Sequence, residues 1–279
     1  AYEIVSRDWS SDVCSSDLLA RAIAQEVNLE LGHNFVIVEN RPGAGGNVSA
    51  EYVKSSGTPM LYITSTGFFI NQSLGAPYNS DDFVPVFAIG RIPMMLVKSQ
   101  ASYFNLQGNF NAQYNVAHAG NGTTAWYAAK LLRKHYPYLE LVGYKGTADA
   151  YTDLAANRVN ITFDFPGGAD AFFSAGLMEP VAVTSARRLK DYPNLPTLAE
   201  TFKDPSLVIH GTHMIVANTA MPTARVQQIN RVLQRATARQ DFVNFVEQNH
   251  IQFVGGSVNT ARSFYYKEGE FWRNTVKNQ

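Results

Sequence analysis

Two glycine-rich loops contain the residues of this sequence best suited to binding a ligand. The first covers residues 39–47 (ENRPGAGGN), and the second covers residues 119–124 (AGNGTT) and leads into an apolar stretch ending at Leu132. Glycine lacks a Cβ atom, so the backbone can approach a ligand closely, and a helix N-terminus adds N–H donors with partial positive charge. Two such loops predict two α/β units that close on one small anion, which favours a receptor for a small acid over a catalyst.

The second loop carries the stronger binding signal. Thr123 and Thr124 place hydroxyl groups at a predicted helix start, where both helix capping and anion binding occur. The amides of Gly120 and Gly122 are the close-approach positions, and a plain N-cap is the alternative interpretation. The first loop could cradle a carboxylate or be only a tight strand-to-helix turn, since it matches neither a Walker loop nor the dinucleotide fingerprint.

Polar residues also follow three predicted strands. In open parallel sheets, ligands bind at the carboxyl edge, so these positions are candidates for ligand binding. They are Ser65, Thr66, Gly67, Tyr144, Lys145 and Asp164. Each has an ordinary alternative: a turn former for the Ser-Thr pair, a solvated cation for the lysine, and a structural hydrogen bond for the aspartate.

No catalytic or metal-binding pattern is visible. His210 and His213 have no glutamate at metal-ligand spacing, and there is no Gly-x-Ser-x-Gly elbow for a hydrolase. Cys14 is the single cysteine, which excludes an internal disulfide and a cysteine-based metal site. We expect no cofactor, no metal and no enzymatic activity.

Composition sets the class of protein. The chain has 279 residues, of which 46% are apolar and 16% charged, with a net charge of zero. This predicts an ordered globular protein and argues against nucleic-acid or anionic-membrane surfaces, which need clustered Lys and Arg. No apolar run approaches the roughly 20 residues that span a bilayer. Without a signal peptide, the sequence predicts a cytoplasmic protein or the mature form of an exported one.

Strands alternate with helices along most of the chain, which predicts βαβ units and parallel sheets. Asp17 is the expected N-cap of a helix from Leu18 to Leu31. The expected strands cover residues 3–5, 35–38, 60–64, 87–90, 94–97, 115–119, 140–144, 159–163, 180–184, 213–217 and 252–254. The other expected helices run through residues 48–53 and over 124–135, 148–156, 169–175, 223–238, 240–249 and 259–277.

Residues 8–18 (DWSSDVCSSDL) resemble the translation of a widely used sequencing adapter. We interpret them as a replacement of genuine sequence, which would make Cys14 foreign. A genuine loop rich in serine and aspartate is the alternative.

From about Leu19 to the C-terminus, the chain resembles the substrate-binding proteins of tripartite tricarboxylate transporters, the Bug family of bacterial periplasmic receptors. The resemblance depends on several phrases taken together. They are VENRPGAGGN at 38–47, AGNGTT at 119–124, YKGTA at 144–148, FD at 163–164, AVTSARR at 182–188 and PNLPTLAE at 193–200.

The resemblance implies a two-lobe periplasmic-binding-protein fold of type II, with two parallel-type sheets flanked by helices and a ligand cleft between the lobes. Lobe 1 would comprise 1–98 plus 211–279, and lobe 2 would comprise 99–210. The ligand would be a small carboxylate held by amides, hydroxyls and waters. By position, its ligand-binding residues are Asp17, Ser65, Thr66, Gly67, Gly120, Gly122, Thr123, Thr124, Tyr144 and Asp164.

The implied function is an extracytoplasmic solute receptor, monomeric and periplasmic, that delivers a carboxylate to membrane transporter subunits. The loop at 42–46 then becomes mainly architectural. Two features depart from the family pattern: residues 8–18 replace a glycine-glycine loop, which would weaken ligand binding, and the turn at 56–59 is shortened. An α/β enzyme acting on a small anion through Lys145 or Asp164, and a sensory ligand-binding module, remain alternatives.

Overall fold

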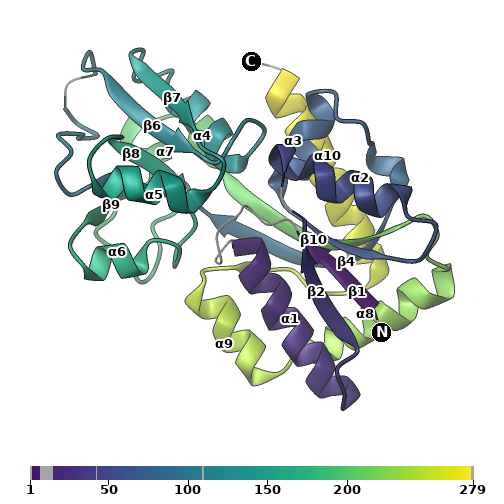
Figure 1. Ribbon diagram of the computed structural model, residues 1–279. Helices are drawn as coiled ribbons and strands as arrows, with labels where there is room; N and C mark the ends of the chain where they lie inside the picture. The colour runs from purple at the N-terminus through teal and green to yellow at the C-terminus, as the bar shows by residue number, and fades with distance from the viewer. Residues whose placement is uncertain (1, 7–14, 42, 109, 278–279) are drawn as a thin grey trace. The chain divides into compact units, whose positions relative to one another are not determined.

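Alternating strands and helices build two separate β-sheets in this chain (Figure 1). The structure is a computed structural model that describes residues 2–6, 15–41, 43–108 and 110–277. The chain divides into two units. Unit 1 contains the described residues of 2–6, 15–91 and 212–277, and unit 2 contains those of 92–211. Unit 1 is therefore assembled from the two ends of the chain.

The sheet of unit 1 has six strands in the order β11-β4-β10-β3-β1-β2. Strand β1 pairs in parallel with β2 and β3, whereas β10 is antiparallel to β3 and β11 is antiparallel to β4. The strand bounds are β1 Tyr2–Ser6, β2 Val36–Asn40, β3 Leu61–Thr64, β4 Phe83–Pro93, β10 His210–Asn218 and β11 Gln252–Phe253.

Among the residues that the structure describes, six helices cover this sheet. In Figure 1, α1, α8 and α9 lie on one side of the strands and α2, α3 and α10 on the other. Helix α1 buries Leu19, Ile23 and Val27 at the four-residue spacing of one helical face. The bounds are α1 Ser15–Leu31, α2 Asn47–Ser55, α3 Thr66–Ser73, α8 Thr223–Ala236, α9 Gln240–Gln248 and α10 Val258–Lys277, with short 3₁₀ turns at Ala44–Gly46 and Ser80–Asp82.

The sheet of unit 2 has five strands in the order β7-β6-β8-β5-β9. The parallel strands β7, β6 and β8 lie side by side, and β5 is antiparallel to both β8 and β9. Helix α5 packs Ala150, Tyr151 and Leu154 into the core beneath these strands. The bounds are β5 Met95–Ser99, β6 Tyr114–His118, β7 Leu139–Gly143, β8 Ile161–Asp164, β9 Met178–Val183, α4 Thr124–Leu132, α5 Thr147–Ala155, α6 Asp170–Ser174 and α7 Leu198–Phe202, with a 3₁₀ turn at Pro205–Leu207.

Four details differ from the sequence-based expectations. Helix α1 begins at Ser15, so Asp17 lies in its first turn and is not its N-cap. Helices α3 and α7 were not expected. Strand β5 hydrogen-bonds to β8 and β9, which places Met95–Ser99 in unit 2, although the expected boundary at residue 98 put most of it in lobe 1. Both sheets also contain antiparallel pairs, because β5 and β10 return against their neighbours.

Over the described ranges, no helix combines the length and the apolar character that a bilayer span requires.

The side chain of Asn218 fixes the shortened turn that precedes β3. Its Oδ1 accepts a hydrogen bond from the Met60 amide at 3.1 Å, and its Nδ2 donates to the carbonyls of Ser56 at 3.0 Å and Thr58 at 2.8 Å. Asn218 is only 1% exposed. A single buried side-chain amide thus holds the turn between α2 and β3, although Asn218 is far from that turn in the sequence.

We expect Asn218→Ala to lower the free energy of unfolding by about 2 kcal/mol, because three hydrogen bonds to backbone groups are lost together. Thr219→Ala, at the exposed neighbouring position, should change it little. Urea denaturation of both variants measures the difference, and equal midpoints would contradict the role given to Asn218.

Candidate functional site

The first candidate cluster lies where β3 ends and α3 begins, in unit 1. Ser65 is the N-cap residue of α3, with an extended backbone (φ −118°, ψ 175°), and Thr66 and Gly67 form its first turn. All three residues are buried. The first amides of a helix lack acceptors within the helix, which makes this end suited to an anion. The structure thus places the predicted Ser-Thr-Gly group at a helix N-terminus, which the sequence did not predict.

Asp17 is engaged by protein groups. Its Oδ2 pairs with Arg21 Nε at 2.8 Å, and its Oδ1 accepts a hydrogen bond from Asn40 Nδ2 at 2.9 Å. The side chain is almost fully buried, and it ties the first turn of α1 to the end of β2. A carboxylate repels the carboxylate of a ligand, and this one is already bonded to protein groups. These contacts favour a role of Asp17 in positioning the surrounding backbone over direct contact with an acid.

A buried carboxylate on α10, which the sequence analysis did not single out, supports the start of α3. Glu268 accepts hydrogen bonds from Arg91 Nε at 2.8 Å and from Thr212 Oγ1 at 2.5 Å, and it forms an ion pair with Arg91. The Thr212 amide donates to Thr66 Oγ1 at 2.5 Å. Arg91 and Thr212 are the residues at which the chain leaves and re-enters unit 1. One carboxylate therefore joins both connecting strands to the candidate ligand end of α3.

We expect Glu268→Gln to lower the free energy of unfolding by about 3 kcal/mol, because Arg91 then lacks its buried counter-charge. Glu270→Gln, on the exposed side of the same helix, is the matched control and should have almost no effect. Chemical denaturation of the two variants is the measurement. Similar losses in both would exclude a special role for Glu268.

Neighbouring side chains form hydrogen bonds to the backbone of the first glycine-rich loop. Gly45 and Gly46 have positive φ angles of 68° and 92°, which glycine adopts without strain. The carbonyl of Gly45 accepts from Asn71 Nδ2 at 2.9 Å, and that of Gly46 accepts from Ser49 Oγ at 2.9 Å. These contacts favour an architectural role for the described part of this loop. Pro42 lies outside the described residues.

The second glycine-rich loop connects β6 to α4 in unit 2. Gly120 and Gly122 have φ angles of 98° and 78°, and Thr123 is the N-cap of α4. Thr123 Oγ1 accepts from the Trp126 amide at 3.1 Å and donates to the Gly120 carbonyl at 2.8 Å. The capping interpretation therefore holds for Thr123. Thr124 is nearly buried, and within the described chain its hydroxyl has no hydrogen-bond partner.

His118, which the sequence analysis did not single out, orders this loop. Its Nδ1 accepts a hydrogen bond from the Gly120 amide at 3.2 Å, which requires that nitrogen to be unprotonated. Burial lowers the pKa of His118 below its ordinary value and so favours the neutral ring. The Gly120 N–H is thus engaged within the protein. Gly122 and Thr124 stay predicted ligand-binding residues of this loop.

Tyr144 follows β7, next to the same loop, and its amide donates to the His118 carbonyl at 2.9 Å. Its hydroxyl donates to Asp153 Oδ2 on α5 at 2.8 Å. Burial and this hydrogen bond raise the pKa of Tyr144 to about 12, so the hydroxyl stays protonated. To contact a ligand, the Tyr144 hydroxyl would have to give up Asp153 or serve as an acceptor. Lys145 is exposed.

Asp164 ends β8, where its carboxyl group meets the hydroxyl of Tyr151 and lies against Gly168. Burial raises the pKa of Asp164 to about 7. A protonated carboxyl group can donate a hydrogen bond to an anion, whereas an ionised one repels it. Position 168 requires glycine for steric reasons, because a Cβ atom there would collide with the Asp164 carboxyl group.

The raised pKa of Asp164 predicts a pH-dependent stability. Between its ordinary pKa of 3.8 and about 7, the folded chain keeps a proton that the unfolded chain loses. The resulting stabilisation is complete below about pH 4 and disappears as the pH rises to 7.

Relative to Asp164→Asn, wild-type protein should therefore lose unfolding free energy between pH 4 and 7, by at most about 1.4 kcal/mol per pH unit. His118 contributes equally to both proteins and cancels in this comparison. Denaturation over this pH range is the measurement. Asp149→Asn, an exposed site on α5, should follow the wild type, and parallel curves for wild type and Asp164→Asn would refute the shift.

Within each unit, the structure brings the predicted residues to the carboxyl ends of neighbouring strands. In unit 2, the Gly120 loop, Tyr144 and Asp164 follow β6, β7 and β8, which are adjacent in the sheet. In unit 1, Asp17 lies on the helix after β1, and Ser65 follows β3, the neighbour of β1. This is the sheet edge at which open α/β folds bind ligands. The groups gathered there are mostly neutral donors.

Metal ligands do not gather at these edges. Across the part of the chain that the structure describes, no group of three His, Cys, Asp or Glu side chains is arranged to hold a metal ion. His213 has a different contact, because its Nε2 lies 3.2 Å from Ser16 Oγ on α1.

Comparison with known sequences gives one family. The family described as "Tripartite tricarboxylate transporter family receptor" matches residues 19–278. The protein BugT of Bordetella pertussis is 25% identical over 278 residues, which cover 94% of this chain and 85% of BugT. A Pseudomonas protein named for the tcbD-tcbE intergenic region is 29% identical over 275 residues, covering 93% of this chain and 81% of the relative.

Solved structures share the fold. The periplasmic binding protein BugD aligns with a TM-score of 0.87 at 22% identity, covering 99% of this chain and 96% of BugD. A Rhodopseudomonas palustris protein with adipate gives 0.87 at 23% identity, over 99% and 96% of the two chains. MatC from the same species, with bound malate, gives 0.85 at 21% identity, over 99% and 98%. These likenesses confirm the predicted two-lobe fold class, with two sheets flanked by helices.

Proposed function

The chain belongs to the family of tripartite tricarboxylate transporter receptors, the Bug proteins, and on that premise we propose that it is a periplasmic receptor for a small carboxylate. It would capture the acid in the interlobe cleft that the family resemblance implies and deliver it to membrane transporter subunits. The observation that carries this proposal is the family match over residues 19–278, which includes every predicted site residue except Asp17. Two proteins of the same fold are named with the carboxylates adipate and malate.

The chemistry of the candidate site supports an anionic ligand. Each unit presents a helix N-terminus at the carboxyl edge of its sheet, through Ser65–Gly67 at the start of α3 and Gly120–Thr124 at the start of α4. Backbone amides hydrogen-bond a carboxylate without carrying a counter-ion into the site. Each charge-assisted hydrogen bond contributes on the order of 1.5–3 kcal/mol. Several such bonds are sufficient for micromolar affinity.

We propose that the amides at Gly122 and Thr124 contact the ligand directly, with the Thr124 hydroxyl as a further donor. Thr123 and His118 would act through the loop, because their polar atoms hold Gly120 and the first turn of α4. Asp17 would position the start of α1, and Asp164, when protonated, would donate a hydrogen bond. In this arrangement a ligand is bound and released, and no covalent bond changes.

An enzyme acting on a small anion is the competing function, and the raised pKa of Asp164 is the one observation that favours it. A general base near neutral pH would have such a pKa. The Asp164 carboxyl group is, however, already bonded to Tyr151. Turnover of a bound acid that disappears in Asp164→Asn would establish the enzyme, and unchanged ligand after prolonged incubation supports the receptor.

The receptor function predicts that at least one small acid binds, with adipate and malate as the first probes, and that Gly122→Ala weakens its binding about tenfold or more. Alanine is strained at a φ of 78°, so the loop would move its amides away from the ligand. Isothermal titration calorimetry measures the affinity. Gly57→Ala is the matched control, because Gly57 has open space around its Cβ position.

A failed screen of mono-, di- and tricarboxylates, amino acids and aromatic acids would contradict the proposal. Undiminished binding in Gly122→Ala would instead exclude the α4 loop as the contact. Thermal unfolding of each variant separates a lost contact from a lost fold.

A further inference from the structure

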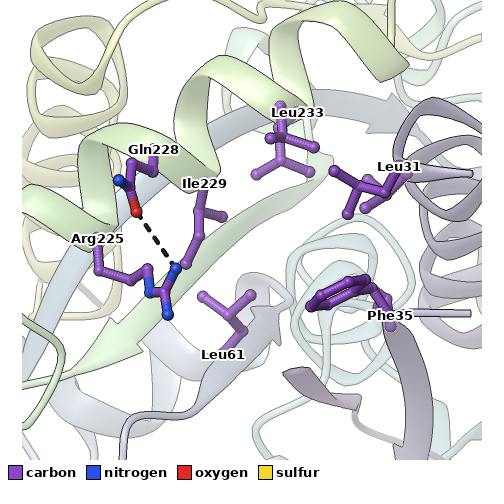
Figure 2. A pocket seen from close by; sticks show the side chains of 10 residues that line it. Leu31, Phe35, Leu61, Arg225, Gln228, Ile229 and Leu233 are labelled. Carbon is purple, nitrogen blue, oxygen red and sulfur yellow. Dashed lines mark hydrogen bonds between the residues drawn. The ribbon is translucent and has the colours of Figure 1, made fainter. Parts of the chain in front are cut away.

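An apolar cavity in unit 1 has no part in the receptor site described above. It lies between α1 and α8, over the first residues of β2 and β3, and has a volume of about 250 Å³ (Figure 2). Val36 and Leu61, the first residues of those strands, line it. The cavity is therefore at the amino end of the strands, whereas the candidate receptor site is at their carboxyl end.

The wall of this cavity is almost entirely hydrocarbon. Figure 2 shows Leu31 and Phe35 on one side, Ile229 and Leu233 of α8 on another, and Leu61 beneath them. A buried water needs two to four polar partners, which such a wall does not supply. An apolar cavity of 150 Å³ is sufficient to bind benzene, so a cavity of this size fits a larger apolar group.

One cation lies at the rim. Arg225 is the single charged residue among the ten that line the cavity, and its Nη1 donates to Gln228 Oε1 at 3.3 Å (Figure 2). Both side chains are exposed, whereas Ile229 and Leu233 are buried on the same helix. The rim thus offers a cationic head-group site above an apolar interior.

We propose that this cavity is a second ligand site for an alkyl monocarboxylate of roughly six to ten carbons. The alkyl chain fills the space between α1 and α8, and the carboxylate lies against Arg225, with Gln228 as a further donor. Such a ligand differs from the small acid of the receptor site, because its affinity comes mainly from buried hydrocarbon. The bound ligand would also contact both α1 and α8, two helices from opposite ends of the chain.

Calorimetric titration with butyrate, hexanoate and octanoate tests the site. Affinity should rise about fourfold for each added CH₂ group until the cavity is full. Arg225→Gln should weaken octanoate binding about tenfold, whereas Arg231→Gln, an exposed arginine on the same helix, should leave it unchanged. Val232→Phe, which adds volume from a half-buried lining position, should abolish octanoate binding.

Adipate and malate titrations of the same variants separate this site from the receptor site. Octanoate binding that survives Val232→Phe but is lost in Gly122→Ala would place the acid at the receptor site and overturn the second site. Affinities that do not depend on chain length would also overturn it. So would a wild-type dimer in sedimentation that becomes monomeric in Val232→Phe, because a second copy would then cover the cavity.

Discussion

The buried carboxylate of Glu268 is the constraint on which the organisation of unit 1 depends. A charge removed from water is tolerated only where opposite charge and hydrogen-bond donors surround it, and Glu268 has Arg91 and Thr212. These two partners lie on β4 and β10, the strands through which the chain leaves and re-enters the unit. The Thr212 amide then continues the network to Thr66. The geometry at the start of α3 is thus fixed by groups far apart in sequence.

The polar side chains at the two candidate edges mostly form hydrogen bonds to other groups of the protein. Tyr144 is bonded to Asp153, Thr123 caps α4, and Asp17 joins Arg21 to Asn40. A side chain held in this way cannot relax around a poorly fitting ligand, and it also holds nearby backbone amides in place. Such preorganisation reduces the entropy lost on binding. Discrimination between acids would then come from the positions of the amides more than from any one charged residue.

The sequence predicted those features that depend on residues close together along the chain. Periodicity and capping residues predicted nearly all strands and helices, because the burial of an apolar face follows from spacing alone. Helix α3 was missed because TGFFINQS is apolar without a helical period, and it is buried on every side at its start. The Glu268 network was not predictable, since its partners lie 177 and 56 residues away along the chain. The same holds for the pairing of Tyr144 with Asp153, which exists only once α5 packs against the sheet of unit 2.

The division of unit 1 between the two ends of the chain affects the order in which the two units can fold during synthesis. All of unit 2 leaves the ribosome before β10, α8 and α10 have been made, so it can assemble first. Until then β3 lacks its antiparallel neighbour and β4 lacks both of its own, leaving three open strand edges in the nascent chain. Synthesis of β10 and β11 closes these edges, and α10, which carries Glu268, is the last helix to be made.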